Sequence, residues 1–539
     1  MKFHCLEDLD DAEGTVLLHD INNDGNLILH PTPNPNDPND PLRWPKWQKY
    51  VCFFSVCSFA FLTNYAIGGM SPAFYPLSIE FDKTVTQTSG LLIWPILTLG
   101  VFNFLWVPLA LYIGKRPVFV FSTLLLSMAF LWGALAKSFE SLLWSTIVAA
   151  FAGSASEALA ASIVNDVFFL HERANLMGWY MNAIAGGNTI GPLICGFVIS
   201  GTSWRVHKWH SFGLVVVNFL LVLFFVPETR YDRSTINVDV FTSFDDDPAS
   251  RNDYPLSPRS KTFPRIAHDP EKDTHVPSTN ALECSRQAHQ TPKKSYTQTL
   301  SLWPGLAKDT NLFKLFFRLF PVLAYPAVIF SFLGFAVSLA WVVAIGILNS
   351  FILQAPPYSW SPSINGLINI PALLGNLLGA FIGGWLVDRY SDWRSRTNGG
   401  IFQPETRLHF LIVPALIVPA GCLAFGYGVA ATLHWTSLFF GYGMVNVGLT
   451  AVPTMTMTYV SDSYLPVNAD ALTLVVGMKN VVAFGVLYGV VPWVDSVGYV
   501  KAFGTQAGIF VAIMMLGVPL VIWGQQIRDV TARWKIILA

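Results

Sequence analysis

The sequence predicts an all-α integral membrane protein whose twelve transmembrane helices form two six-helix bundles. Of its 539 residues, 53% are hydrophobic and only 12% are charged, whereas about 25% of an ordinary soluble domain is charged. No Asp, Glu, Lys or Arg occurs between Leu319 and Val387, a run much longer than the roughly 20 residues that cross a bilayer once. The Pro- and Ser-containing segment 354–362 divides this run, which therefore predicts two membrane helices joined by a short loop.

Other uncharged runs locate the remaining helices, because a charge at the bilayer centre costs about 2.5–3.5 kcal/mol. Helices are favoured over open structures because lipid offers no hydrogen-bond partners to the backbone, and the alternating segments of a membrane β-barrel are absent from the sequence. In the first half the predicted spans are 50–75, 90–113, 117–136, 141–165, 175–200 and 210–227. In the second half they are 321–353, 364–387, 408–430, 434–459, 471–493 and 503–527.

These spans divide the chain into five regions. They are an N-terminal segment 1–49, an N-terminal bundle 50–227, a linker 228–318, a C-terminal bundle 319–527 and a tail 528–539. The linker is rich in Pro, Ser and Asp with little apolar periodicity, so we predict that it is mostly disordered. Its Ser and Thr residues are candidate phosphorylation sites, but any disordered tract contains such residues and we favour a plain linker.

The distribution of Lys and Arg predicts the orientation. With the N-terminus inside, the predicted outer loops hold only Lys83, Lys137, Arg205, Lys208 and Lys501. The inner side then carries Arg43, Lys46, Lys49, Lys115, Arg116, Arg173, Arg389, Arg394, Arg396, Arg407, Arg528, Arg533 and Lys535. We therefore expect both termini and the linker to be cytoplasmic.

Composition and motifs also exclude several functional classes. The net charge of −1 indicates no nucleic-acid partner, and the six cysteines show neither a disulfide framework nor metal-ligand spacing. The sequence has no Walker loop, nucleophile elbow or zinc-binding helix pattern. We therefore predict no enzymatic activity, no cofactor and no bound metal, and we expect a monomer in the lipid bilayer.

Two short segments at equivalent places in the two halves carry a related pattern. After the second predicted helix the chain reads Gly114-Lys115-Arg116, and after the eighth it reads Gly384-Trp-Leu-Val-Asp388-Arg389. These segments resemble the loop signature of the major facilitator superfamily, in which charged residues hold the cytoplasmic side closed. The first copy has no acid, since Ala110 and Leu111 stand in the region where the family has one. The alternative is that Lys115 and Arg116 are only positive-inside charges.

Further stretches resemble a particular group within that superfamily. They are 36–45 (Asn-Asp-Pro-Asn-Asp-Pro-Leu-Arg-Trp-Pro), 165–173, 226–231 and 398–408. Together they are similar to the fungal twelve-helix drug:proton antiporter-like group. The resemblance implies two stacked bundles that rock about a central site, with export of drugs and metabolites or import of small cations such as polyamines.

Glycines are spaced regularly in two of the predicted helices. Gly187, Gly191, Pro192 and Gly196 in the fifth helix are similar to the family's antiporter motif, which favours export, although close helix packing alone explains the glycines. The eighth helix has a comparable ladder, which we interpret as a packing face against the fifth helix. Its members are Gly375, Gly379 and Gly383.

Ionisable groups inside the predicted helices are the main functional candidates. Thr146 stands where family members often carry an Arg linked to proton coupling, so another group is needed for that role. Away from the helix ends, Glu157 and Lys479 are the acid and the base that remain. Glu157 is the candidate proton- or cation-coupling acid and Lys479 a candidate substrate-cavity residue, or both have structural partners. Their direct pairing requires the two halves to close between them.

Several polar residues in apolar helices are additional substrate-cavity candidates. Each of them has an alternative role as an interhelical hydrogen-bonding group worth about 0.6 kcal/mol. These residues are Asn64, Tyr65, Asn349, Asn446 and Asn480.

The sequence thus predicts a secondary transporter of small organic molecules that works by alternating access. The leading hypothesis is efflux of a drug or secondary metabolite, with protons as a candidate coupling ion. Uptake of a polyamine or another cationic nutrient is the first alternative, and a non-transporting nutrient sensor is the second. We expect the plasma membrane, with the vacuolar membrane as the alternative.

Overall fold

The computed structural model describes residues 37–231, 293–301, 305, 311–356 and 358–535, together with short stretches at both ends of the chain. Within these residues, twelve helical segments are long and apolar enough to cross a bilayer. The predicted all-α membrane fold is confirmed. The described strands are two-residue pairs outside these helices: β1 (Phe3–His4) with β6 (Ile537–Leu538), β2 (Val16–Leu17) with β5 (Ile401–Phe402), and β3 (His19–Asp20) with β4 (Asn26–Leu27), all antiparallel.

The N-terminal bundle consists of six crossing segments. Its helices are α1 (Lys46–Gly68), which continues through a 3-10 turn into α2 (Phe74–Glu80), then α3 (Val85–Ile113), α4 (Lys115–Leu135), α5 (Phe139–Val167), α6 (Arg173–Gly201) and α7 (Trp204–Phe225). Polar residues begin two of them: Thr84 and Gln87 form a capping box at α3, and the Ser138 hydroxyl accepts from the Ser141 N–H at α5.

The C-terminal bundle contains the other six segments. They are α12 (Pro326–Gln354); α13 (Pro362–Gly366) with α14 (Asn369–Ala380) and α15 (Val387–Thr397); α16 (Ile412–Ala430); α17 (Thr436–Ser463); α18 (Asn468–Val497); and α19 (Tyr499–Met515) with α20 (Gly517–Thr531). Before this bundle lie two shorter helices, α10 (Tyr296–Thr299) and α11 (Leu312–Leu319).

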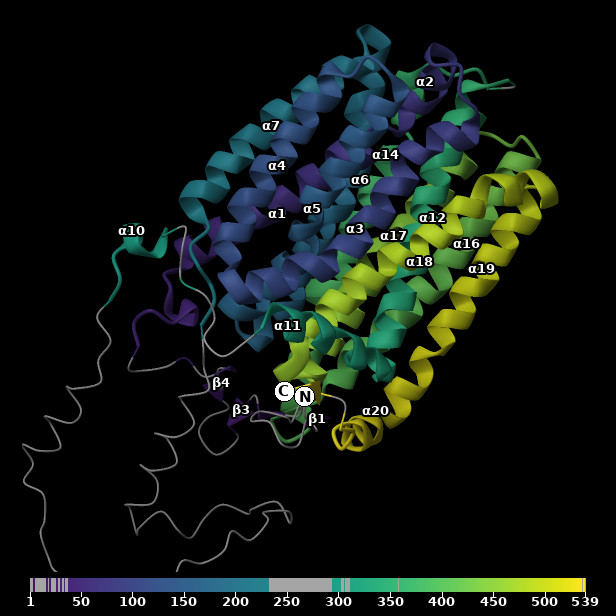
Figure 1. Cartoon of the computed structure of the whole chain (residues 1–539). Helices are drawn as coiled ribbons and strands as arrows, with labels where there is room; N and C mark the ends of the chain where they lie inside the picture. The colour runs from purple at the N-terminus through teal and green to yellow at the C-terminus, as the bar shows by residue number, and fades with distance from the viewer. Residues whose placement is uncertain are drawn as a thin grey trace, which may run out of the picture.

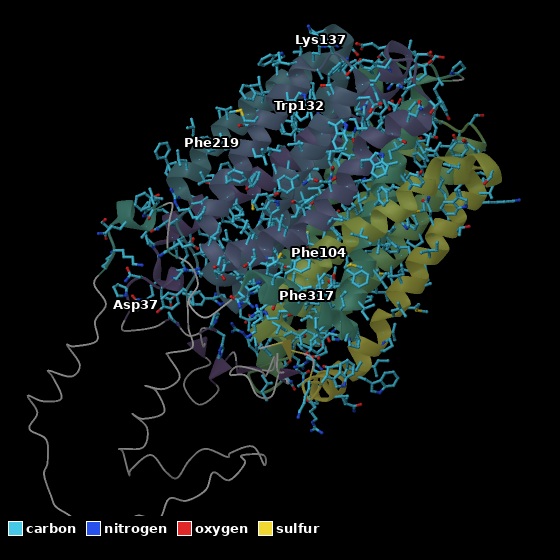
Figure 2. All side chains as sticks on the ribbon, in the orientation of Figure 1. Asp37, Phe104, Trp132, Lys137, Phe219 and Phe317 are labelled. Atoms are coloured by element: carbon cyan, nitrogen blue, oxygen red, sulfur yellow. The ribbon has the colours of Figure 1, made fainter. Side chains whose placement is uncertain are left out.

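The two bundles stand side by side, and both chain termini lie at the same end of the molecule, which we call the terminal end (Figure 1). Lys137 marks the opposite end, and Trp132 lies on the flank of the N-terminal bundle (Figure 2). The Trp132 side chain is 42% exposed, as expected for an aromatic residue that faces lipid.

Several sequence-based boundaries need correction. Gly384, Asp388 and Arg389 do not lie in a loop, because a π-helical turn (Phe381–Leu386) connects α14 to α15 without a break. Arg205 and Lys208 belong to α7 and not to a loop, and Lys208 is fully buried. The short helix α10 and most of α11 lie within the predicted linker 228–318, and residues 232–292 of that linker lie outside the described part of the chain, so its mostly disordered state stays a prediction.

The glycine ladders pack mainly within their own bundles. A β-carbon on Gly187 would lie 2.3 Å from the Phe61 carbonyl oxygen, so this glycine lets α6 approach α1. The prediction that the eighth-helix ladder packs on the fifth helix is wrong, because a β-carbon on Gly379 would lie 2.4 Å from the Val447 carbonyl oxygen of α17. Gly191 likewise faces α1, and Gly375 and Gly383 face α17.

Other glycines do join the bundles. On α6, a β-carbon at Gly196 would lie 2.5 Å from the Pro362 carbonyl oxygen at the start of α13. At the crossing of α3 and α18, a β-carbon on Gly100 would lie 2.9 Å from both the Gly477 carbonyl oxygen and the Asn480 side chain. The small residues therefore bring α18 close enough to the N-terminal bundle for its side chains to reach across.

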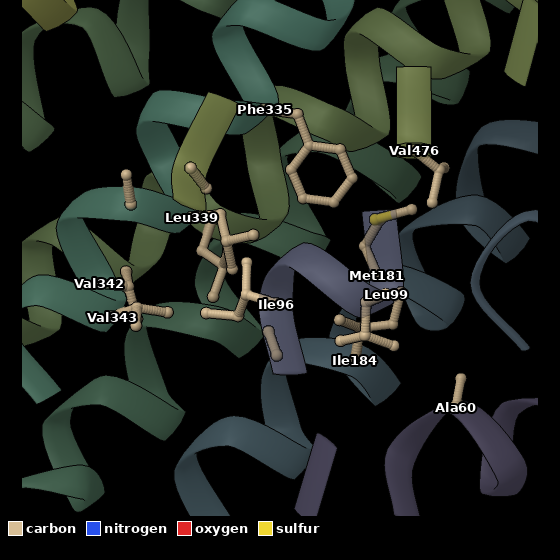
Figure 3. Packing of buried hydrophobic residues seen from close by; sticks show 14 of the residues in the cluster. Ala60, Ile96, Leu99, Met181, Ile184, Phe335, Leu339, Val342, Val343 and Val476 are labelled. Atoms are coloured by element: carbon tan, nitrogen blue, oxygen red, sulfur yellow. The ribbon is translucent and has the colours of Figure 1, made fainter. Parts of the chain in front are cut away.

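Apolar side chains from both bundles meet at the centre of the molecule. Ile96 and Leu99 of α3 and Met181 of α6 lie close to Phe335 and Leu339 of α12 (Figure 3), and all five are buried. Any ionisable group at this level is therefore held in an environment of low polarity.

Candidate functional site

An ion pair links the two bundles inside this apolar core. The Lys479 Nζ of α18 lies 3.1 Å from the Glu157 Oε2 of α5, and both side chains are 1% exposed. On the sequence alone, Glu157 and Lys479 can pair directly only if the two bundles close between them, and this pair is present in the structure. A buried charge pair in a membrane protein costs desolvation energy that good geometry must offset.

Three neighbours complete the surroundings of the pair. The Asn480 Nδ2 donates to the same Glu157 Oε2 at 2.8 Å. The Tyr180 hydroxyl of α6 donates to the Glu157 backbone carbonyl. The Lys479 Nζ also lies 4.3 Å from the centre of the Phe335 ring, a cation–π geometry. Residues from α5, α6, α12 and α18 thus surround one ion pair, and we call this group the central pair site.

The other polar candidates contact different partners. The Asn64 Nδ2 donates to the Ala60 carbonyl, and its Oδ1 accepts from Asn188 of α6 at 3.3 Å. The Tyr65 hydroxyl pairs with His210 Nδ1 at 3.1 Å. Both candidates therefore join helices within the N-terminal bundle.

The remaining two candidates lie in the C-terminal bundle. The Asn446 Nδ2 donates to the Tyr442 carbonyl within α17 at 2.8 Å. Asn349 is 3% exposed, and no partner is recorded for its Oδ1 among the described residues. Of the six predicted cavity residues, the contacts therefore bring Lys479 and Asn480 to Glu157, and they place the other four elsewhere.

A second set of charges joins the bundles at the terminal end. Asp462, at the end of α17, accepts from Arg173 of α6 at 3.0 Å and from Arg407 Nε at 2.5 Å. Arg407 also donates to the Asp388 Oδ1 at 2.8 Å, and the Asp388 Oδ2 accepts from the backbone N–H of Asn175 at 2.7 Å. Side chains of both bundles are thus held in one network, which we call the terminal-end network.

The first copy of the paired signature is built differently. Lys115 forms an ion pair with Asp166 and donates to the Ser162 hydroxyl at 2.5 Å. The Glu228 carboxylate accepts from the backbone N–H groups of Lys115 and Arg116, each at 3.1 Å. This acid, from a distant part of the chain, occupies the start of α4, where a negative charge is stabilised. Arg116 is 2% exposed and donates to the Leu223 carbonyl of α7 at 2.7 Å.

The opposite end is also bridged between bundles. The Gln354 Nε2 donates to the Pro72 carbonyl at 3.0 Å, and the Ser363 N–H donates to the Ser200 hydroxyl at 3.0 Å. The Tyr75 N–H donates to the Ser350 hydroxyl at 3.3 Å. Cross-bundle contacts therefore exist at both ends and at the centre.

Sequence reasoning missed some of the residues that join the bundles. Asp462 was not predicted, since it lies three residues beyond the predicted tenth helix, and its position at a helix end is the one signal that the sequence offers for it. Tyr180 carries no recognisable motif and is identified only by its contact with Glu157. Arg389, predicted as part of the gate, is exposed, and no ion pair or hydrogen bond is recorded for it in the described chain.

The fold and these sites define a class. Two six-helix bundles share a buried charge pair and contact each other at both ends, as in secondary transporters. The family model of the Major Facilitator Superfamily matches residues 54–484. The chain belongs to the Major Facilitator Superfamily and is a secondary transporter of small molecules rather than an enzyme.

Relatives of the chain include several named fungal transporters. An MFS-type transporter of Schizosaccharomyces pombe is 26% identical, with 97% of this chain and 94% of the relative covered. The MFS antiporter QDR3 of Candida albicans is 23% identical over 87% of this chain and 77% of its own length. The efflux pump vrtL of Penicillium aethiopicum is 23% identical over 94% of this chain and 90% of its own length.

A solved structure agrees with the fold. The human organic anion transporter MFSD10 (TETRAN) superimposes with a TM-score of 0.52 at 16% identity, covering 88% of this chain and 100% of that one. The similarity to the fungal drug-antiporter-like group that the motifs suggested is likewise confirmed.

Proposed function

We propose that this chain exports a small organic molecule, a drug or a secondary metabolite, by alternating access that is coupled to protons through Glu157. The observation that carries the proposal is the ion pair of Glu157 and Lys479, which holds α5 of one bundle to α18 of the other. Export is further supported by the similarity to QDR3 and vrtL, which are named as an antiporter and an efflux pump.

The central pair site supplies a mechanism for coupling. While Glu157 is ionised, it attracts the Lys479 ammonium and accepts from Asn480, so the bundles are held together at the centre. Protonation of Glu157 removes the negative charge and leaves the ammonium in an apolar environment without its counter-ion, which is unfavourable. The bundles then separate more easily, and the contacts that the ionised Glu157 makes at the centre are lost.

Proton-driven export requires that the proton and the cargo exclude one another at the centre. A polar group of the cargo binds between Lys479 and the ionised Glu157, and protonation of Glu157 removes that site, so that the cargo leaves and the proton crosses in the opposite direction. In this scheme the terminal-end network and the contacts at the opposite end open in alternation, since simultaneous opening would let ions leak.

The geometry favours export over uptake of a polyamine. A cationic cargo requires free carboxylates at the centre, but Glu157 is already held by Lys479 and Asn480. Such a cargo would have to displace the ammonium of the protein itself. For orientation, we propose that the terminal end faces the cytoplasm, in agreement with the distribution of Lys and Arg, and that the plasma membrane is the location.

Glu157→Gln tests the coupling role, with Glu140→Gln as the matched control because Glu140 is an exposed acid in the first turn of the same helix. Untargeted metabolite profiling of cells with and without the gene first identifies a compound that accumulates inside when the gene is lost. Flux of that compound in proteoliposomes is then measured with and without a pH gradient. We expect Glu157→Gln to reduce gradient-driven flux at least tenfold, and Glu140→Gln to leave it unchanged.

The double variant Glu157→Gln/Lys479→Gln separates coupling from stability. It leaves no unpaired charge, so we expect thermal stability close to that of the wild type but no response of flux to the pH gradient. Full gradient-dependent flux in this variant would remove Glu157 from the coupling mechanism.

A further inference from the structure

A large groove lies apart from the central pair site, between α1 and α6 on one side and α15 on the other. Its volume is about 1070 Å³. We call it the lateral groove. It lies toward the terminal end, where Asp388 and Arg407 of the terminal-end network form part of its lining. It is therefore placed where a movement of the bundles changes its shape.

The wall of the lateral groove is aromatic and faces the bilayer. Phe54, Trp179 and Trp385 line it, with exposed fractions of 61%, 55% and 50%. These exposed aromatic side chains belong to helices that cross the membrane, so the groove opens toward lipid and not only toward water. Flat aromatic surfaces of this kind favour a ligand that has an aromatic or apolar body.

A buried polar atom in the groove, the Asn182 Oδ1, has no hydrogen-bond partner among the described residues. Asn182 of α6 lines the groove, its Oδ1 is buried, and no hydrogen bond is recorded for its amide within the described chain. It lies nine residues after Arg173, hence ~14 Å along the helix at 1.5 Å per residue. An amide that is removed from water without a partner is unfavourable. A ligand hydroxyl, which both donates and accepts, would satisfy it in either orientation of the amide.

The charges around the lateral groove are balanced. Glu172, Asp388 and Asp392 line it together with Arg389, Arg396 and Arg407. Two of the acids are already used, since Asp388 binds Arg407 at 2.8 Å and Asp392 binds Arg396 at 3.2 Å. This arrangement gives no net attraction for a charged ligand, and selectivity therefore comes from the aromatic wall and Asn182.

The groove and the central pair site use opposite faces of the same helix. Trp179, Asn182 and Ala183 of α6 line the groove, while Tyr180 contacts Glu157 and Met181 lies in the central core (Figure 3). A displacement of α6 changes both sites together. A molecule in the groove is therefore positioned to be transferred to the centre when α6 moves.

We propose that the lateral groove binds uncharged aromatic amphiphiles that carry a hydroxyl group, and that cargo enters the transporter through it from the bilayer leaflet at the terminal end. The entry role rests on the proposed function, since it makes the groove the first stop of an exported molecule. Binding to the groove is independent of that function.

Octyl gallate, an uncharged aromatic amphiphile with hydroxyl groups, is a suitable probe. Binding of the radiolabelled compound is measured to the purified full-length chain in phosphatidylcholine nanodiscs, with empty nanodiscs subtracted. Ala183→Phe fills the groove and Asn182→Leu removes the amide. We expect saturable binding whose affinity each variant lowers at least tenfold. Asn376→Leu is the matched control, because Asn376 is also a buried amide without a partner for its side chain atoms but lies on α14 outside the groove. The Asn376→Leu variant should bind octyl gallate with the affinity of the wild type.

Other outcomes would overturn the proposal. Binding no greater than that of empty nanodiscs, or affinity unchanged in both groove variants, would exclude the groove as the binding site. Displacement of the probe by a few per cent of phosphatidylserine would identify a lipid site instead of a cargo site. Normal export by Ala183→Phe, despite lost binding, would exclude the entry role.

The two proposals fail in different ways. Retained gradient-dependent flux in Glu157→Gln contradicts the coupling role and leaves groove binding intact. A thermal unfolding curve for each variant confirms that lost binding does not reflect lost folding.

Discussion

The two copies of the paired signature differ in what they hold together. In the first copy, Lys115 binds Asp166 and Ser162, and Glu228 caps α4, so every one of these partners belongs to the N-terminal half of the chain. In the second copy, Asp388 binds Arg407 and also accepts from the Asn175 N–H of the other bundle. The first copy stabilises a bundle, whereas the second joins two bundles.

Burial strengthens this contrast. The Arg407 and Asp462 side chains are each 1% exposed, while the Asp166 side chain that pairs with Lys115 is 26% exposed. Ion pairs that are shielded from water are costly to break once formed, and accessible pairs contribute little. The position of the acid therefore decides whether the same motif joins the two bundles or caps a helix.

The largest effect is expected from Arg407→Ala, which removes the group between Asp388 and Asp462. Two buried carboxylates then lose a partner. Removing one partner of a buried pair lowers the free energy of unfolding by about 3–5 kcal/mol. We expect the terminal end to open and thermal stability to fall. Spin labels at the exposed positions 46 and 394, one on each bundle, report the opening as a longer distance. An unchanged distance distribution would contradict the role of the terminal-end network as a gate.

An intermediate effect is expected from Asp388→Asn. The amide still accepts one hydrogen bond but loses the charge that binds Arg407, while Asp462 continues to hold Arg407 and Arg173. The same spin-label pair should show two populations, closed and open, instead of a complete shift. Glu228→Gln is the control from the first copy, and its distance distribution should match that of the wild type.

The smallest effect is expected from Lys115→Met. The Asp166 side chain remains accessible to water after the change. The free energy of unfolding should therefore fall by about 1 kcal/mol or less. The readouts are the spin-label distance, which should not change, and the unfolding temperature, which should fall by less than in Arg407→Ala. A longer distance in Lys115→Met would show that the first copy also acts as a gate.

Much of the fold could be predicted from the sequence because membrane helices obey a local rule. Each must be long, apolar and nearly free of charge, so the uncharged runs located all twelve crossing segments of the described chain. The same rule singled out Glu157 and Lys479 as exceptions. It failed at Gly384–Arg389, where polar residues continue a helix beyond the apolar span, and at Lys208, which is buried inside α7.

The sequence by itself determined the class of this protein, its two-bundle organisation and the presence of two charges at membrane depth. The tertiary structure decided which groups meet: Glu157 with Lys479 and Asn480, Asp462 with Arg173 and Arg407, and an aromatic groove beside α6. The physical reason is that apolarity and charge are properties of each segment, whereas a pair or a groove depends on how helices distant in the sequence pack against one another.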